Sequence, residues 1–367
     1  MLTRYFLQFK DSISIFNLFE YLTFKIALSA ITALLISFII GPIVIKKLKK
    51  YQIGEEIRTN GPKSHLVKKG TPTMGGVIII FASLLPTLFF SDLNNTMVII
   101  VLLSTFWMGA IGFIDDYLKI IIKTKSGMIA RYKLLGQIIL GGIIAYIIIN
   151  SNDFSGFNTK TTVPFFKNFE FDFGLFYPIM VIIVLTGSSN SVNLTDGLDG
   201  LAIGLLAICF TVFTAISYIS GRIDFSDYLN ILYLPSAGEL SIFSSAVVGA
   251  CLGFLWFNAS PAEIFMGDTG SLSLGAALGT MSILLKKELL LFIIGGVFVI
   301  ETLSVIIQVS YFRYTKYRHG KGERFFKMAP IHHHFELSGI QESKIVIRFW
   351  IIGILLALLS LATFKVR

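Results

Sequence analysis

Long runs of apolar residues separated by short polar stretches dominate the pattern of this chain. The runs hold roughly 18 to 25 residues each, enough for a helix to cross about 30 Å of hydrocarbon. Gly and Ser interrupt the fifth and eighth runs, which is typical of short or broken spans. The pattern predicts about ten membrane-spanning helices, at residues 22–45, 74–91, 97–114, 134–150, 174–192, 199–219, 240–257, 270–285, 289–311 and 344–364.

Composition agrees with an all-α polytopic membrane protein. Of the 367 residues, 54% are hydrophobic and only 14% are charged, which excludes an ordinary soluble enzyme of two or three domains. The sequence shows no internal repeat, low-complexity tract or soluble linker. A single integral membrane domain covering residues 1–367 is therefore the simplest prediction.

The basic residues predict the orientation. Lys and Arg crowd three connections, those after the first, third and ninth predicted spans, at residues 46–70, 115–133 and 313–327. By the positive-inside rule these connections are cytoplasmic, which places both termini on the opposite, periplasmic face. The net charge of +9 then reflects topology and attraction to anionic lipid or phosphate substrates, rather than nucleic-acid binding.

Two remaining features read as structural. Cys209 and Cys251 lie inside apolar runs and suit packing, without a disulfide or a CxxC metal site. The longest outer connection, residues 151–173, is rich in Phe, Asn and Thr and has no clustered acid or base groups. It predicts a small hairpin or an interfacial segment.

Polar clusters follow the odd-numbered spans. "GFIDDYLK" ends the third span, "NSVNLTDGLDG" the fifth, "FNASPAEIFMGDTGS" the seventh, and a run of three histidines follows the ninth. Alternating topology places all four on one face, the face that the Lys and Arg pattern assigns to the cytoplasm. We therefore expect one active site assembled from distant parts of the chain.

Carboxylates are the main candidates for its chemistry. Asp115 and Asp116 end an apolar run, where acids are costly unless paired, hydrated or bound to a cation; a solvated helix end is the alternative. Neighbouring helical residues point about 100° apart, so one can face a metal or nucleophile while the other orients a neighbour. Asp196 and Asp199 alternate with glycines that allow close backbone approach to a ligand. Asp268 lies between glycines, where a helix-capping role is the competing interpretation.

Converging carboxylates with few soft ligands favour Mg²⁺ or Mn²⁺, whose coordination shell is completed by water and substrate phosphate. Lys68, Lys119 and Lys133 can balance further phosphate charge, although each is also explained as a lysine that fixes topology. Phosphoryl chemistry next to a bilayer is the reaction class that these groups predict.

His332, His333 and His334 permit three interpretations: a zinc site, a structural turn after Pro330, or groups that position an anionic substrate. Three consecutive imidazoles do not easily meet at one metal from regular backbone, and no Cys or HxxxH completes a tetrahedral set. Their predicted face is shared with the aspartates, which favours substrate positioning.

Six stretches in order, "GTPTMGG", "GFIDDYLK", "NLTDGLDG", "FMGDTGS", "GGVFVIETLSVIIQV" and "MAPIHHHFE", resemble the phospho-N-acetylmuramoyl-pentapeptide transferases. These enzymes belong to the polyprenyl-phosphate N-acetylhexosamine-1-phosphate transferase superfamily, and the resemblance runs from about residue 20 to the C-terminus. It implies Mg²⁺-dependent transfer of phospho-MurNAc-pentapeptide from UDP-MurNAc-pentapeptide to undecaprenyl phosphate, giving lipid I and UMP. It also implies the bacterial cytoplasmic (inner) membrane, peptidoglycan synthesis and a homodimer as a plausible assembly.

The resemblance also implies roles for individual residues. Asp268 resembles the Mg²⁺ ligand, and Asp115 and Asp116 resemble the essential acidic pair. The matching positions in the substrate region are Lys68, Thr73, Lys119 and Lys133 for nucleotide and phosphate, Asn193, Asp196, Gly197 and Asn258 for binding or orienting the nucleotide, Phe265 for stacking on uracil, and His332, His333 and His334 for positioning.

Competing functions and mechanisms stay open at the level of sequence. A sister transferase that uses UDP-GlcNAc shares the aspartate motifs. A transporter is disfavoured because the acids end helices on one face and no repeat is visible. Within the transferase reaction, Asp115 can deprotonate or position the attacking lipid phosphate, or an aspartate can form a covalent phospho-sugar intermediate. Direct attack is the simpler expectation, because a lipid monophosphate ionises a second time near pH 6 and needs little help from a base.

Overall fold

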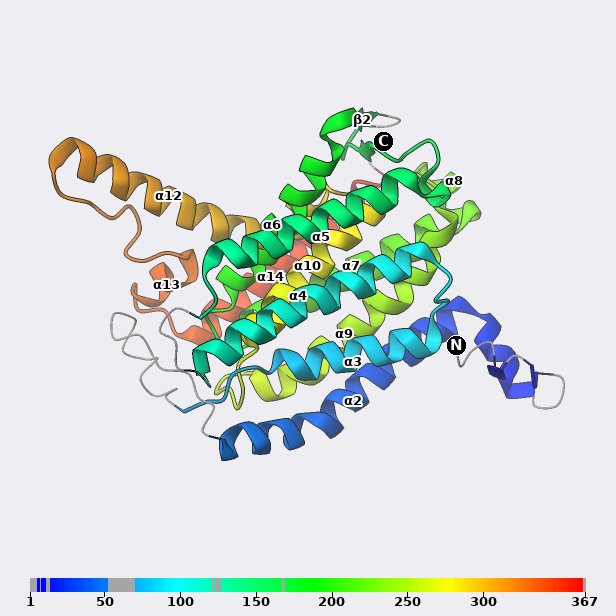
Figure 1. The fold of residues 1–367 in the computed structure, drawn as a ribbon, viewed down its shortest axis with the longest axis horizontal. Coiled ribbons are helices and arrows are strands. Elements are labelled where there is room, and N and C mark those ends of the chain that lie inside the picture. The colour runs from blue at the N-terminus through cyan, green and yellow to red at the C-terminus, as the bar shows by residue number, and fades with distance from the viewer. Residues whose placement is uncertain are drawn as a thin grey trace.

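The computed structural model describes residues 5–6, 8–10, 14–51, 70–120, 122, 127–166 and 169–365. Within these ranges the chain forms a tilted bundle of long helices with one small hairpin at one end (Figure 1). The elements that build the bundle are α2 (Leu22–Lys50), α3 (Gly76–Phe90), α4 (Thr96–Ile120), α5 (Ala130–Asn150), α6 (Tyr177–Thr195), α7 (Leu201–Ser220), α9 (Leu240–Asn258), α10 (Gly267–Leu284), α12 (Gly296–His319) and α14 (Glu342–Ala362).

Short elements connect these helices. The helical ones are η1 (Ser14–Glu20), η3 (Asn152–Phe154), η4 (Gly174–Phe176), α8 (Ile223–Leu229), η5 (Pro235–Glu239), α11 (Leu291–Ile294) and α13 (Ile331–Glu336). The hairpin consists of β1 (Lys160–Thr162) and β2 (Glu170–Asp172), which pair antiparallel with Thr161 opposite Phe171.

A helix occupies each of the ten predicted spans, so the all-α polytopic membrane fold is confirmed. In the described part of the chain, eight helices are long and apolar enough to cross a membrane. The other two predicted spans are α3, which has 15 residues, and α10, which has 18.

Helix α10 is the centre of the bundle. From Thr269 to its end every side chain is buried, although the sequence is rich in Gly and Ser. Small residues on the neighbouring helices explain the close fit: a Cβ at Gly76 would meet the backbone of Gly270, and one at Gly112 would meet the backbone of Asp268. Helices pack this closely only where small residues let their backbones approach. The low hydropathy of α10 therefore suits a helix that contacts protein rather than lipid.

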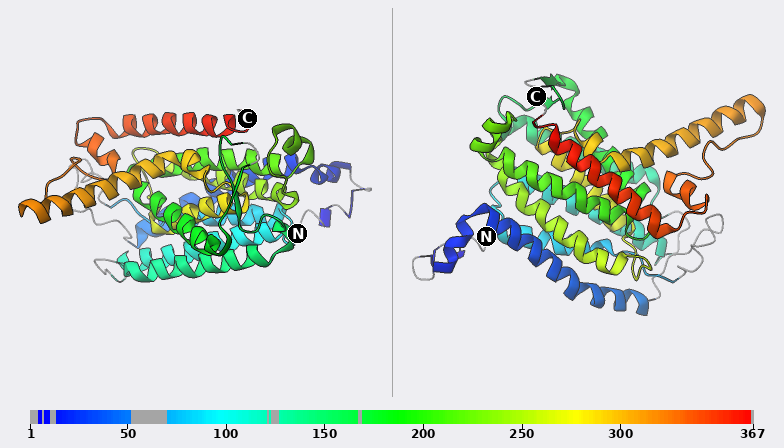
Figure 2. Two further views of the ribbon diagram at one scale, coloured as in Figure 1. Left: turned by 90° about the horizontal axis from the view of Figure 1, so that it is seen from above. Right: turned by 180° about the vertical axis from the view of Figure 1, so that it is seen from behind.

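The ninth predicted span, residues 289–311, differs from the observed structure. The chain forms the single turn α11, breaks at Gly295, and continues as α12 as far as His319. Gly296 lies close to α14: a Cβ on Gly296 would stand 2.8 Å from Cδ1 of Leu356. Beyond the break α12 leaves the bundle at an angle and its basic end projects outward (Figures 1 and 2).

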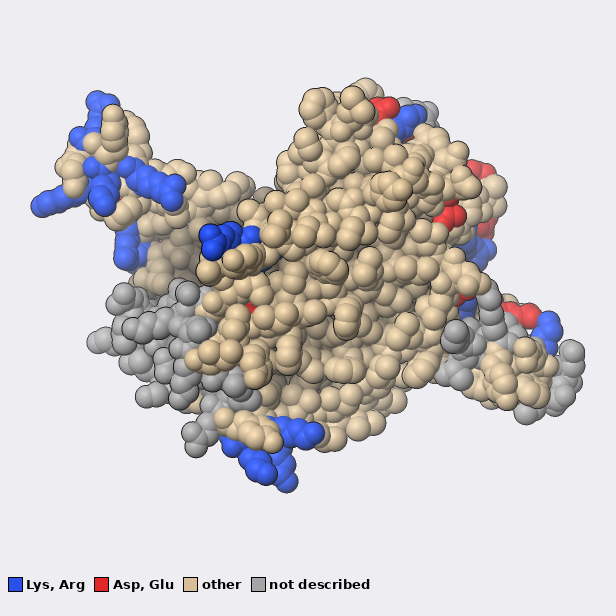
Figure 3. Space-filling view, in the orientation of Figure 1, with Lys and Arg blue, Asp and Glu red and all other residues tan. Residues whose placement is uncertain are grey.

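One end of the bundle carries exposed Lys and Arg on the last turns of α2 and on the projecting end of α12 (Figure 3). At the opposite end, near both chain termini, Lys and Arg lie among Asp and Glu (Figures 1 and 3). This arrangement agrees with the predicted separation of basic connections from the termini, and we call the two ends the basic end and the outer end. The side of the membrane that each end faces remains a prediction.

The 151–173 connection forms the predicted hairpin at the outer end. Strand β1 rests on the turn between α10 and α11, where Thr162 donates through Oγ1 to the Lys286 carbonyl at 2.7 Å. Thr161 donates to the Glu288 carboxylate, and Lys287 donates to Thr162 Oγ1 at 3.0 Å. Cys209 and Cys251 are buried and form no disulfide, as their apolar surroundings predict.

Candidate active site

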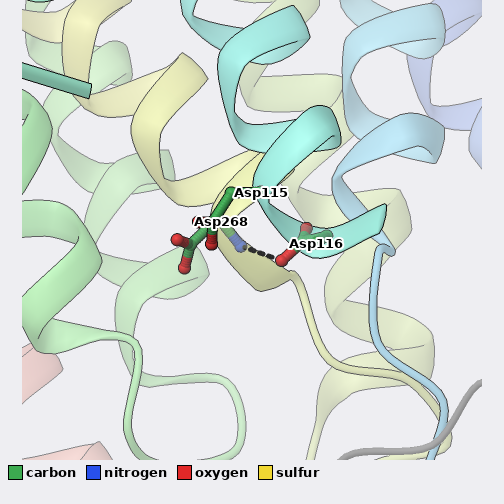
Figure 4. Close-up of side chains that lie close together, drawn as sticks. All are labelled: Asp115, Asp116 and Asp268. Atoms are coloured by element: carbon green, nitrogen blue, oxygen red, sulfur yellow. Dashed lines mark hydrogen bonds between the residues drawn. The ribbon is translucent and has the colours of Figure 1, made fainter. Parts of the chain in front are cut away.

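Three carboxylates from two helices meet at the basic end. Asp115 and Asp116 stand near the end of α4, and Asp268 is in the first turn of α10. One ligand oxygen from each lies within 4.8 Å of the others, the one such acidic group found among the described residues. Figure 4 shows Asp115 and Asp268 side by side, with Asp116 turned toward the backbone at the start of α10.

Asp116 acts as the cap of α10. Its carboxylate accepts from the backbone N–H of Asp268 at 3.1 Å, from the N–H of Thr269 at 2.9 Å and from the Thr269 hydroxyl at 2.6 Å. The first amides of a helix have no partner within the helix, so a carboxylate there satisfies them and complements the helix dipole. The capping interpretation considered for Asp268 therefore applies to Asp116 instead.

A glycine makes this approach possible. Gly267 has a φ of +72°, and a Cβ there would stand 2.7 Å from the Asp116 carboxylate and 2.9 Å from Thr73 Oγ1. Thr73 is buried beside it in the segment that precedes α3. That segment pairs with the chain before α10, because the N–H of Phe265 donates to the Pro72 carbonyl at 2.8 Å. Thr73 and Phe265, both predicted site residues, are thus held next to each other.

Asp115 and Asp268 share two lysines. Lys119, one turn after Asp115, forms ion pairs with Asp115 and, at 3.0 Å, with Asp268. Lys133, from the first turn of α5, lies 3.0 Å from Asp115 and 2.5 Å from Asp268. The N–H of Met128 also donates to Asp115 at 2.7 Å, which joins the α4–α5 connection to the cluster.

Helix α6 supplies the third side of the cluster. Asn193 donates through Nδ2 to Asp268 Oδ1 at 2.9 Å and to Ser271 Oγ at 2.8 Å. Three carboxylates and two ammonium groups leave one negative charge in excess, and all the donor atoms of the acidic group are hard oxygens. These residues fit a divalent cation of the magnesium type, which takes oxygen ligands and leaves positions for phosphate oxygens.

The loop that follows α6 is fixed by a second set of polar contacts. The amide of Asn258 spans two loops: its Oδ1 accepts from Gly200 N–H at 3.0 Å, and its Nδ2 donates to the Ile264 carbonyl at 2.8 Å. Asn258 is buried, so its geometry suits orienting the loops. Asp196 ends α6 and is half-buried, and the N–H of Asp199 donates to Glu342 at 2.8 Å.

The histidines of α13 have separate partners. His332 Nδ1 lies 3.1 Å from Glu301 Oε2 and is fully buried, while His333 Nδ1 lies 3.3 Å from Glu336. His334 Nδ1 accepts from the N–H of Lys327 at 3.2 Å. Of the three, His332 reaches the 196–200 loop, since a Cβ on Gly197 would collide with its Nε2.

The structure thus brings together Asp115, Asp116, Lys119, Lys133, Asn193 and Asp268, with Thr73 and Phe265 at the α10 start. Lys68 lies outside the described residues. Sequence reasoning missed Thr269 as the partner of Asp116, and it missed Glu301. A signal for Glu301 existed, because a lone acid in an apolar span needs a partner.

An open hollow of about 300 Å³ adjoins the cluster. Lys133 lines it together with Arg131, Gln137 and Asn190, and Leu134 adds an apolar side. In this hollow the basic side chains stand beside the exposed face of α5. An anionic group could therefore bind the basic side chains while an apolar chain attached to it lies along α5.

Sequence comparisons relate the chain to known proteins. The sequence model described as glycosyl transferase family 4 matches residues 98–286, and a signature described as phospho-N-acetylmuramoyl-pentapeptide-transferase signature 1 matches residues 68–80. A relative from Desulforapulum autotrophicum is 49% identical over the full length of both chains. Relatives from Citrifermentans bemidjiense and Desulfatibacillum aliphaticivorans are 50% and 51% identical, each alignment covering 96% of both chains. All three carry the name phospho-N-acetylmuramoyl-pentapeptide-transferase.

Proposed function

The chain belongs to the phospho-N-acetylmuramoyl-pentapeptide-transferase family, and from that premise we propose that the cluster around Asp115 and Asp268 is its catalytic centre. The protein is a multi-pass membrane enzyme that transfers phospho-MurNAc-pentapeptide in peptidoglycan synthesis. The donor is UDP-MurNAc-pentapeptide, the acceptor is undecaprenyl phosphate, and the products are lipid I and UMP. The proposed location is the bacterial inner membrane, with the basic end in the cytoplasm.

One observation carries the assignment of the site: three carboxylates and two lysines converge where α4, α5 and α10 meet. When bound, Mg²⁺ would supply charge neutralisation for the diphosphate and for the departing UMP. Asp268 is the residue that would hold it, with Asp115 beside it as a positioning group. Asp116 would keep Asp268 in place through the start of α10, and Asn193 would orient the second Asp268 oxygen.

The chemistry is then a displacement at phosphorus. An oxygen of the lipid phosphate attacks the phosphorus attached to the sugar, a new P–O bond forms, and the bond to UMP breaks with its electron pair leaving on UMP. The attacking phosphate is already largely a dianion near neutral pH, so no proton has to be removed. Lys119 and Lys133 would stabilise the phosphate oxygens as charge shifts toward UMP.

Direct attack is preferred over a covalent aspartyl intermediate on geometric grounds. Asp115 is buried and already paired with Lys119, Lys133 and the Met128 amide, which fixes it as a positioning group. A nucleophilic carboxylate would need a free face toward phosphorus. Incubation with radiolabelled UDP-MurNAc-pentapeptide but no lipid acceptor should leave the protein unlabelled; a stable sugar-phosphate adduct would overturn direct attack.

One assay tests the proposed function. The purified protein, Mg²⁺ and undecaprenyl phosphate are incubated with UDP-MurNAc-pentapeptide or with UDP-GlcNAc, and UMP is measured. We expect UMP only with the first donor and none after chelation with EDTA, with recovery when Mg²⁺ returns. UMP from UDP-GlcNAc alone would identify the sister transferase, and activity that survives EDTA would reject the metal assignment.

A further inference from the structure

A buried acid and histidine pair stands apart from the aspartate cluster. Glu301 of α12 and His332 of α13 are both fully buried, and Glu301 Oε2 lies 3.1 Å from His332 Nδ1. Glu301 is the lone acidic residue in the apolar stretch "GGVFVIETLSVIIQV". Placing an ionisable group at this depth is costly, so its retention calls for a function.

The chain holds the two residues together by folding back along α12. Gln308 accepts from the N–H of Phe326 at 2.8 Å, and Thr315 accepts from the N–H of Glu323 at 2.9 Å. These contacts fasten the 320–330 connection against the helix that precedes it. As a result α13 returns beside the first turns of α12, where Glu301 meets His332.

Fold stability does not explain this pair. A buried ionic pair is often no more stabilising than apolar residues of the same volume, because desolvation offsets the attraction. In addition, Glu301 Oε1 and His332 Nε2 are both buried and have no hydrogen-bond partner among the described residues. Unsatisfied buried polar atoms are rare in folded proteins and point to a functional role.

The unpaired ring nitrogen of His332, Nε2, faces the 196–200 loop. Nε2 lies against Gly197, where a Cβ would stand only 2.3 Å from it. Gly197 follows α6 by two residues, and Asn193 on the last turn of that helix donates to Asp268. The imidazole therefore lies against the connection that directly follows the helical turn carrying Asn193.

We infer that Glu301 is a positioning residue for the transfer reaction, which accepts the Nδ1 hydrogen of His332 and so holds Nε2 against Gly197, fixing the 196–200 loop where the UDP-sugar substrate is proposed to bind. The inference rests on the proposed function. An acceptor at Nδ1 fixes both the tautomer and the ring orientation, as carboxylates do for histidines at many active sites. Glu301 itself does not contact the substrate.

A double-mutant cycle separates this role from a structural one. The variants are E301A, H332A and the double variant E301A/H332A, measured by kcat/KM for UDP-MurNAc-pentapeptide and by KM for undecaprenyl phosphate. We expect each single variant to lose about 10- to 100-fold in kcat/KM, the size typical of a lost orienting partner. We expect the double variant to be no worse than H332A, because Glu301 acts only through His332. The KM for the lipid should not change.

Conservative and control variants sharpen the test. E301Q keeps an acceptor oxygen and should retain activity within a few-fold of wild type, whereas E301L fills the same volume without an acceptor and should match E301A. If E301A folds poorly, E301L takes its place in the cycle. Ser304→Ala is the matched control: Ser304 is buried one turn along α12 and donates only to the Glu301 carbonyl, so S304A should leave kcat/KM unchanged.

Two results would overturn the inference. Losses that multiply in the double variant would show that Glu301 acts independently of His332, and an E301L protein with wild-type kcat/KM would show that no positioning is needed. Release of UMP by the wild-type protein tests the proposed function separately. An active wild type with multiplying losses therefore rejects the role of Glu301 alone, whereas an inactive wild type rejects both.

Discussion

Asp116 caps α10, whereas Asp268 pairs with the two shared lysines, and this difference makes the first prediction specific. Asp268→Asn removes a charge from the shared lysines but leaves the α10 cap intact, so we expect a loss of activity of about 10²- to 10³-fold with little change in Tm. Asp116→Asn weakens the bonds to Thr269 and should cost about 1–3 kcal/mol of stability in addition to activity. UMP release and thermal unfolding in detergent check both variants. Equal effects on Tm would contradict this division.

A single methyl group tests the close approach at Gly197. A Cβ there collides with His332 Nε2, so Gly197→Ala should displace the imidazole and lower kcat/KM about 10- to 100-fold. Gly142 is the matched control, because it lies within α5 and a Cβ there meets nothing within 4 Å. G142A should retain full activity. If G197A is fully active while its crystal structure shows a displaced His332, the contact is not needed for transfer.

Sequence reasoning named the residues that the structure brings together around Asp268, but not the separate contacts that each of them makes. Asp115 and Asp116 were expected to differ because neighbouring helical residues point apart. Which of them caps α10 depends on where α4 crosses α10, and that crossing depends on how closely Gly112 allows the two backbones to approach. Glu301 was missed for the same kind of reason, because its partner lies 31 positions away along the chain.

At the scale of elements, long apolar runs were enough to predict the helices. The boundary of the ninth span was wrong because Gly295 breaks the helix and α12 then continues beyond its apolar part into a basic, projecting end. Apolar length measures the hydrocarbon that a segment can cross, whereas a helix can extend past the membrane. The Gly- and Ser-rich α10 was predicted with its bounds nearly correct, and its low hydropathy follows from burial inside protein.

The outer hairpin supplies a prediction about pH. Burial raises the pKa of Glu288 to about 7 from its ordinary 4.5, and burial lowers the pKa of Lys286 to about 8 from its ordinary 10.5. Between pH 4.5 and 7 the folded protein holds the Glu288 proton more tightly than the unfolded chain, so stability should fall as the pH rises. Above pH 8 the unfolded chain binds more protons at Lys286, so stability should rise again.

Glu288→Gln tests the part of this pH profile below pH 7, where titration of Glu288 is expected to lower stability. The amide keeps a partner for the Thr161 hydroxyl but cannot titrate, so the fall in Tm between pH 5 and 7 should be smaller than in wild type. Thermal unfolding of both proteins at matched ionic strength measures the difference. Parallel profiles for the two proteins would show that Glu288 does not titrate in the folded state over this range.

At the scale of the whole molecule, two unrelated patterns coincide at one end. Exposed lysines and arginines lie on the last turns of α2 and on the projecting end of α12 (Figure 3), and the aspartate cluster lies at the same end of the bundle, between the end of α4 and the start of α10 (Figures 1 and 4). The positive-inside rule explains where the basic residues lie, and the proposed reaction explains where the acids lie. Both patterns are visible in the sequence, which therefore predicted that they share one end. The angle of α12 was not predictable, because it depends on the packing of Gly296 against α14.

The remaining prediction is the side of the membrane that each end faces. Asp153 at the outer end and Lys321 beyond α12 are both exposed, and each can be replaced by Cys without touching the aspartate cluster. Cys209 and Cys251 are buried, so the wild-type protein should not react with a membrane-impermeant maleimide. D153C should be labelled in right-side-out vesicles and K321C only in inside-out vesicles, because the positive-inside rule places the basic end in the cytoplasm. A UDP-linked donor made in the cytoplasm could then reach the cluster without crossing the bilayer. The reverse labelling pattern would put the site on the wrong side for such a donor, and labelling of both positions from one side would contradict the bundle topology itself.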